Sequence, residues 1–179
     1  KSGDPHSDAI VMIESDSMIR ARNWHPERLY FLISAARHFA QSLRDRGFTV
    51  MYLNASSIEG GLKQARAKLG ETDVLATEPS SIARRQRLEK LGVSLAPNDF
   101  FLTSRELFNS WAIDQKSFRM ENFYRKQRVR LDILMDGNQP LGGAWNFDAD
   151  NRLPPPRNYE WPPYLIHEPD DLDRQVAAE

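Results

Sequence analysis

The chain has 179 residues, a formal net charge of −1 and no cysteine. This length suits one compact domain with a core, and the balanced charge gives no general attraction to nucleic acid. The lack of cysteine excludes disulfides, thiol catalysis and thiolate-bound metal clusters within these residues. The four histidines are scattered without ligand spacing, so no metal site is predicted.

The sequence contains no apolar run near the roughly 20 residues that a membrane-spanning helix needs. Its N-terminal residues are polar and lack the apolar stretch of a secretory signal peptide. We therefore expect a cytoplasmic protein that makes no contact with membranes.

The first hundred residues alternate apolar strands with amphipathic helices. Strands are predicted at residues 9–14, 48–53, 73–77 and 93–96, and helices at residues 26–46, 58–69 and 81–91. A glycine follows each of these helices, as is common at helix ends. This alternation predicts an α/β fold, a doubly wound, Rossmann-like parallel sheet with helices on both faces.

The pattern changes after residue 100. Thr103 and Glu106 have the spacing of a capping box that opens a helix, and Ser117 is predicted to cap a second helix over residues 118–134. Prolines and then acidic residues dominate from Leu153 onward. We therefore expect a domain over residues 1–152, in which these two helices follow the sheet. Residues 153–179 are expected to form an extended linker or tail.

Two carboxylates follow predicted strands, Glu14 after the first and Glu78 after the third. Ligands of a doubly wound sheet gather beyond the carboxyl ends of its strands. There a carboxylate can bind the hydroxyls of a ribityl chain or the edge of a heteroaromatic ring. The alternative is that each carboxylate caps a helix or pairs with an arginine. Arg37, on a largely apolar helix, needs such a partner, and an ion pair is its simpler role.

A basic segment with interleaved aromatic residues covers residues 119–130. Its candidate phosphate contacts are Arg119, Arg125, Lys126 and Arg128. Basic and aromatic side chains together suit phosphate binding and base stacking. They equally suit the solvated face of an amphipathic helix, which is the more frequent case. The sequence leaves both roles open.

Four segments resemble a known family in their order and spacing. They are SAARHFAQSLRDRGFTV, VLATEPSS, DFFLTSRELFNSWA and SFRMENFYRKQRVRLDILMDGNQPLGGAWNFDADNR. They resemble the deoxyribodipyrimidine photolyase-related proteins, the bacterial branch that includes iron–sulfur cryptochromes and photolyases. The resemblance covers about residues 9–152.

The resemblance implies a role in a larger flavoprotein. The N-terminal α/β domain of this family holds an antenna chromophore, here a 6,7-dimethyl-8-ribityllumazine or a similar molecule. A C-terminal helical domain binds FAD and a [4Fe–4S] cluster and receives damaged DNA. That domain lies outside these residues. The chain alone is therefore expected to lack repair activity, while its parent would be a photolyase-type lyase or a light sensor.

The resemblance also implies an antenna pocket in this chain. By position the pocket would be lined by Ile13, Glu14, Ser15, Met18, Leu32 and Ala36, and Glu78 joins this set from its place after a strand. Members with a lumazine tend to carry a carboxylate where Met18 stands. The family also has an earlier, central strand ending in Gly-Asp-Gln-Leu. Without it, two sheet edges would lack a partner, and association or replacement pairing is expected.

Two other functions stay open on the residues alone. A stand-alone α/β domain that binds a small molecule or nucleotide would use the same strand-end carboxylates. A nucleic-acid-binding module would act through residues 119–130, with an affinity that falls steeply with salt.

Overall fold

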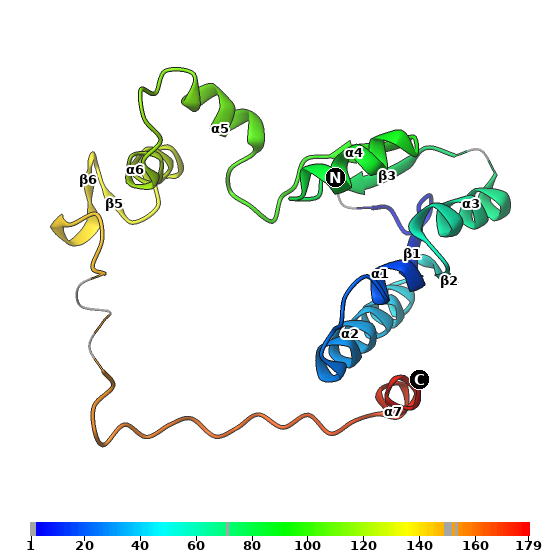
Figure 1. Ribbon diagram of the computed structural model, residues 1–179. Helices are drawn as coiled ribbons and strands as arrows, with labels where there is room; N and C mark the ends of the chain where they lie inside the picture. The colour runs from blue at the N-terminus through cyan, green and yellow to red at the C-terminus, as the bar shows by residue number, and fades with distance from the viewer. Residues whose placement is uncertain (1–2, 71, 149–151, 153) are drawn as a thin grey trace. The chain divides into compact units, whose positions relative to one another are not determined.

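The computed structural model describes residues 3–70, 72–148, 152 and 154–179. Two compact units divide the chain. The first comprises Lys1–Val74, Lys90–Val93 and Tyr164–Glu179, and the second comprises Leu75–Glu89 and Ser94–Pro163. The first unit is therefore assembled from three separate stretches of sequence (Figure 1).

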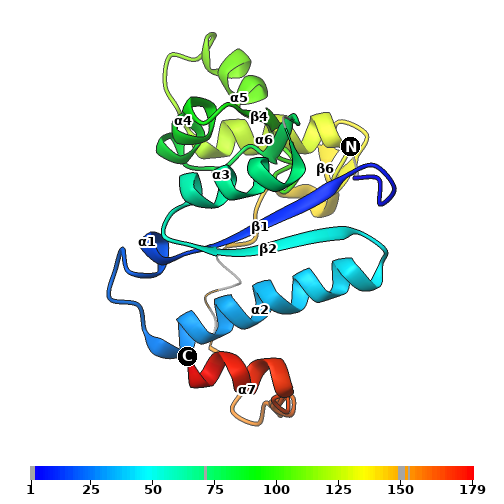
Figure 2. The ribbon, with the colours of Figure 1, turned by 90° about the vertical axis from the view of Figure 1, so that its right-hand side faces the viewer.

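A parallel strand pair forms the centre of the first unit. Strand β1 (Ala9–Ser15) pairs with β2 (Thr49–Ala55) along the full length of both. Successive side chains of a strand point to opposite faces, and Ile13 and Glu14 illustrate this. Glu14 binds Arg37 of helix α2 (Pro26–Asp45), whereas Ile13 packs against Gly61 of α3 (Ile58–Leu69). The two helices thus cover opposite faces of the pair (Figure 2).

Local sequence explains where these elements begin and end. The short helix α1 (Asp16–Ile19) follows β1 directly. Gly47 and Gly70 take positive φ values of 85° and 82° just beyond α2 and α3, where a side chain would be strained. Ser57 caps α3 by accepting a hydrogen bond from the Gly60 N–H at 3.1 Å. In this unit β1, β2, α2 and α3 confirm the predicted strands and helices to within two residues, whereas α1 was not predicted.

Close packing joins these elements. The buried apolar core of this unit includes Ala40, Leu43, Leu53, Ala55, Leu62 and Ala65. A Cβ placed on Gly61 would lie 2.6 Å from Cγ2 of Ile13, so the backbone of α3 packs directly against the Ile13 side chain of β1. Replacing Gly61 would push α3 away from the sheet.

Part of the predicted extended tail at residues 153–179 is a helix in the structure. Residues 154–170 carry no helix or strand, as expected, but α7 (Asp171–Ala178) follows. Asp170 and Asp173 form a capping box that satisfies backbone N–H groups of the first turn. The buried side chain of Val176 lies on the face that packs on α2. The extended tail is therefore wrong for residues 171–178, and the proposed boundary at residue 152 stays a prediction.

The second unit is formed mainly by short elements. Strands β3 (Val74–Thr77) and β4 (Val93–Ala96) pair, each giving its first residue to the other unit. The helices are α4 (Ile82–Lys90), α5 (Arg105–Ala112) and α6 (Met120–Leu131). A small antiparallel hairpin of β5 (Met135–Asp136) and β6 (Gln139–Pro140) and the 3₁₀ turn η1 (Leu141–Gly143) complete it.

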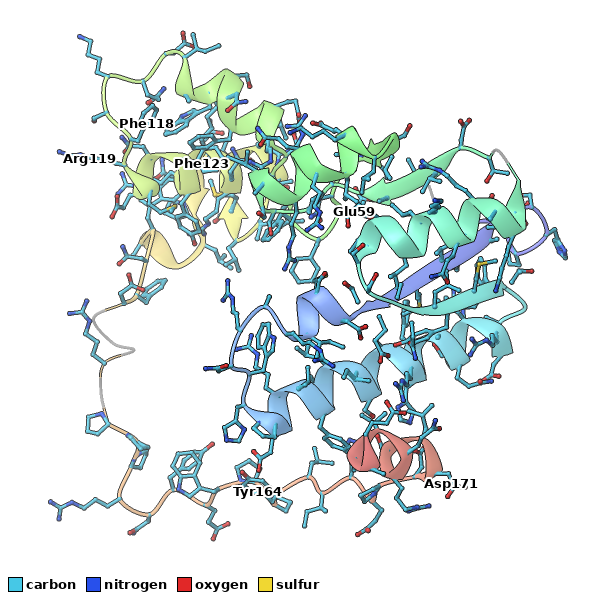
Figure 3. The ribbon with its side chains drawn as sticks, turned by 45° about the vertical axis from the view of Figure 1, so that its right-hand side comes forward. Glu59, Phe118, Arg119, Phe123, Tyr164 and Asp171 are labelled. Carbon is cyan, nitrogen blue, oxygen red and sulfur yellow. The ribbon has the colours of Figure 1, made fainter. Side chains whose placement is uncertain are left out.

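An aromatic cluster joins α5 to α6 (Figure 3). Phe123 of α6 lies 4.9 Å from Trp111 and 5.2 Å from Phe108 of α5, measured between ring centroids. Phe118, in the loop between the helices, contacts both α5 rings. Ring pairs at these separations add to the free energy of area burial. This cluster explains why the aromatic residues of the predicted helices share one side.

The helix starts in this unit differ from the predicted ones. Ser104, not Thr103, caps α5 and accepts a hydrogen bond from the Leu107 N–H at 3.3 Å. Helix α6 begins after Arg119 rather than after Ser117, and it ends three residues earlier than residue 134. Several adjacent residues can serve as caps, so spacing alone does not choose among them.

The chain is a mixed α/β protein. Within the described ranges, each sheet has only two strands, in the orders β1–β2, β3–β4 and β5–β6. A continuous doubly wound sheet is therefore not seen, because β1 and β3 each pair on one side only. Among the same residues, no helix has both the length and the apolar character needed to cross a membrane.

Candidate ligand-binding site at the strand ends

A cavity of about 600 Å³ lies at the carboxyl ends of β1 and β2. The parallel register places Glu14 opposite Asn54, and both line this cavity. Helix α2 supplies Pro26, Leu29, Tyr30 and Ile33. Helix α7 supplies Val176 and Ala177, and Glu179 follows at its C-terminal end. The volume falls within the range of cavities that hold drug-sized ligands.

Arg37 organises the polar side of the cavity. Its guanidinium donates to both carboxylate oxygens of Glu14, at 3.2 and 3.0 Å, and to both oxygens of Glu179, at 2.9 and 2.7 Å. The Tyr52 hydroxyl also donates to Glu14, at 2.7 Å. The predicted ion pair of Arg37 is confirmed, and Glu14 is held rigidly by three donors.

These contacts set the protonation states of the network. The hydrogen bonds that Arg37 donates to Glu179 and Glu14 raise the pKa of Arg37 far above its usual value. The hydrogen bond to Arg37 lowers the pKa of Glu179. Burial, and then the hydrogen bond to Glu14, raise the pKa of Tyr52 to about 12. At neutral pH the tyrosine is therefore a neutral donor, and the arginine bridges two carboxylates.

The lining combines an apolar wall with an acidic rim. Leu29, Tyr30 and Ile33 present carbon-rich surface along α2. Carboxylates come from Glu14, Asp16, Glu27 and Glu179, and no lysine or arginine is among the lining residues that the structure describes. Such a cavity suits a flat ring on its wall and hydroxyl donors at its rim. It disfavours a phosphate, because like charges repel.

The structure separates the residues of the predicted pocket. Glu14 lines the cavity, but Ile13 and Ser15 belong to the opposite face of β1. The Ser15 hydroxyl is buried there against Ser17, at 3.0 Å. Met18 and Leu32 are exposed, Ala36 is half-buried, and none of these three lines the cavity.

Glu78 lies in the second unit, beside a different cavity of about 290 Å³. Its carboxylate is 2.9 Å from Nε of Arg105 and 3.5 Å from Arg85. Its backbone is fixed by Ala96 and by the side chain of Asn98. Pairing with arginine, which the sequence left as the alternative for this residue, is thus observed.

The surroundings of Arg128 do not suit the predicted contact with nucleic acid. It is only 6% exposed, and it donates to the carbonyls of Ile133, Leu134 and Trp145. Its guanidinium also lies over the rings of Tyr124 and Trp145, at 5.5 and 5.3 Å from their centroids. A group enclosed in this way cannot reach a phosphate, so Arg128 is a structural residue.

The remaining basic residues of α6 differ in their surroundings. Arg125 lies over the Trp145 ring, 5.4 Å from its centroid. Arg119, at the start of the helix (Figure 3), and Lys126 are exposed. A phosphate contact at these three positions stays a prediction.

Of the predicted pocket residues only Glu14 lines this cavity, and the contributions of α2, of Asn54 and of α7 were missed. Asn54 ends the second strand and could have been found from the rule that placed Glu14. The α7 residues carried a weaker signal, an aspartate three residues before another aspartate at the start of the helix. Nothing in the local sequence indicated that this helix would reach the strand ends.

Comparison with known proteins gives a consistent result along the chain. The deoxyribodipyrimidine photo-lyase-related protein family matches residues 1–179. A (6-4) photolyase of Agrobacterium fabrum (strain C58 / ATCC 33970) is 34% identical over 97% of the chain. The chain spans 36% of the length of that photolyase. The uncharacterized protein R852 of Acanthamoeba polyphaga mimivirus is 27% identical over 83% of the chain and 84% of its own length.

Proposed function

Since the chain belongs to the deoxyribodipyrimidine photo-lyase-related family, we propose that it is an antenna domain. It binds a light-absorbing cofactor that serves a flavin-binding domain of the same protein. The cofactor is a molecule like 6,7-dimethyl-8-ribityllumazine, which combines a flat heteroaromatic ring with a chain of hydroxyls. The site is the cavity at the ends of β1 and β2.

The acidic rim of this cavity is the observation that carries the proposal. Glu14 and Asn54 stand at adjacent strand ends, where they can accept hydrogen bonds from ribityl hydroxyls. The apolar side of α2 offers a surface for the ring. A ligand without a phosphate fits this set of groups better than a nucleotide does.

We propose further that the parent protein uses light for DNA repair or for sensing. Its FAD and [4Fe–4S] cluster would belong to the C-terminal helical domain, which would also receive damaged DNA. Light absorbed by the antenna would excite the flavin, and the excited flavin would pass an electron to a pyrimidine photoproduct. The present residues would harvest light without catalysing the repair. The protein would act in the cytoplasm.

The proposal also concerns the sheet. We propose that the alternating strands and helices build a doubly wound, Rossmann-like parallel sheet. The support comes from the parallel pairing of β1 with β2 and from the helices on both faces of this pair.

A ligand-binding experiment tests the antenna proposal. The 179-residue chain is titrated with 6,7-dimethyl-8-ribityllumazine, riboflavin and FMN, and binding is followed by fluorescence anisotropy. We expect the two phosphate-free compounds to bind about fivefold more tightly than FMN, because one close like-charge contact costs roughly 1 kcal/mol in water. Failure of all three compounds to bind, or a preference for FMN, would reject the site.

A second function is favoured by the mimivirus relative. Its match covers 84% of its own length, so a related protein exists that is little larger than this domain. The second candidate is accordingly a stand-alone α/β domain that binds a small molecule for regulation. Purification of the native protein from its source distinguishes the two, since an antenna copurifies with flavin in one polypeptide and a stand-alone domain does not.

A further inference from the structure

We propose that α7 is a wall of the ligand cavity, so that docking of α7 on α2 and binding of a ligand strengthen each other. This inference rests on the proposed function, because it concerns the same cavity. According to this inference, residues at the C-terminal end of the sequence help to determine which ligands fit the cavity and how tightly they bind.

The placement of α7 is the first observation. Val176, Ala177 and Glu179 line the cavity together with the strand ends and α2. Val176 is buried in the contact with α2, and α7 lies alongside α2 in two views (Figures 2 and 3). The C-terminal segment therefore contributes three of the described lining residues, next to those of α2 and the strand ends.

Polar contacts hold α7 at both of its ends. At its start, Asp170 lies 2.9 Å from Nε2 of His38, and the Ser34 hydroxyl donates to Asp173. At its end, Glu179 forms a two-pronged ion pair with Arg37. Two anchors about two turns apart fix the rotation of the helix, which determines the side chains that face the cavity.

Arg37 couples the helix to the strand end. The same guanidinium binds Glu179 of α7 and Glu14 of β1. If α7 leaves, Arg37 loses one partner and the cavity loses its wall. A ligand that contacts Ala177 or Glu179 binds the docked state better than the undocked state, and it must therefore stabilise docking by the same factor.

Adjacent alanines provide a matched test of the wall. Both are exposed, but only Ala177 lines the cavity, whereas Ala178 does not. In the 179-residue chain, Ala177→Trp should fill the space and weaken binding of 6,7-dimethyl-8-ribityllumazine by roughly tenfold or more. Ala178→Trp should bind like the unaltered chain.

Undocking gives an independent measurement. Val176→Asp should release α7, increase amide exchange along Asp171–Ala178 and weaken lumazine binding. Saturating lumazine should slow the same exchange in the unaltered chain. If both Ala177→Trp and Val176→Asp bind lumazine as tightly as the unaltered chain, α7 is not a wall of the cavity. The antenna proposal would then still stand. An unaltered chain that binds no lumazine would remove both proposals.

Discussion

Arg37 and Arg128 show how one residue type serves two purposes in this molecule. Each side chain is largely withdrawn from water. Arg37 binds carboxylates at the edge of a cavity, whereas Arg128 donates to backbone carbonyls inside a folded turn. The sequence predicted the first role because an arginine on an apolar helix needs a partner. It did not predict the second, because Trp145 lies 17 residues away from Arg128.

The enclosure of Arg128 predicts a loss of stability on substitution. Arg128→Met should lower the free energy of unfolding by about 2–4 kcal/mol, because three carbonyls would lose a charged donor. Urea denaturation measures this change. Lys126→Ala, an exposed change on the same helix, should stay within about 0.5 kcal/mol. Equal stability of the two variants would contradict the structural role of Arg128.

At the scale of elements, strong local patterns were predictable and tertiary docking was not. The strands and the two long helices of the first unit follow from apolar periodicity and helix-stopping glycines. Helix α7 was missed because prolines dominate the preceding residues. Its anchor joins His38 to Asp170, 132 residues apart. Of the predicted pocket residues only Glu14 lines the cavity, whereas the contributions of α2, β2 and α7 were missed.

The anchor of α7 predicts a pH dependence. The hydrogen bond to Asp170, and then the bond to the Ser34 carbonyl, raise the pKa of His38 above 6.5. The stabilisation by the charged imidazole is complete below pH 6.5 and is lost as the pH rises through the raised pKa. Among the residues that the structure describes, the charged partners of this imidazole are Asp170, which caps α7, and Asp173 of α7.

The rate of amide exchange in α7, corrected for the intrinsic effect of pH, should therefore increase as the pH rises from 6.5 through the raised pKa of His38. His38→Gln should remove the dependence, whereas His25→Gln, at an exposed position before α2, should preserve it. The same pH response in the His38→Gln chain would assign it to another group.

At the scale of the whole molecule, the free strand edges are the main departure from the predicted fold. Both β1 and β3 pair on one side only among the residues that the structure covers. Leu75 of β3 also has 64% of its surface exposed. An unpaired edge beside exposed apolar surface is a template for pairing with another chain. The alternation of strands and helices was predictable from the sequence. This pattern does not indicate which strands pair with each other.

We expect the 179-residue chain to associate as its concentration rises. Sedimentation velocity over a concentration series measures this, and Leu75→Lys should shift the equilibrium toward the monomer at little cost to folding. A species that stays monomeric at every concentration would indicate that the edges are protected.

The discontinuous first unit bears on how shortened versions of the protein are designed. A version trimmed at Arg152, the predicted end of the domain, would keep the predicted strands and helices but lose part of the family match, which extends to residue 179. It would also lack Tyr164–Glu179, which belongs to the first unit, and Arg37 would lose Glu179 as a partner. Under the proposed antenna function, weak pigment retention by such a truncated product would reflect the position of the cut, and extending the product to Glu179 should restore it.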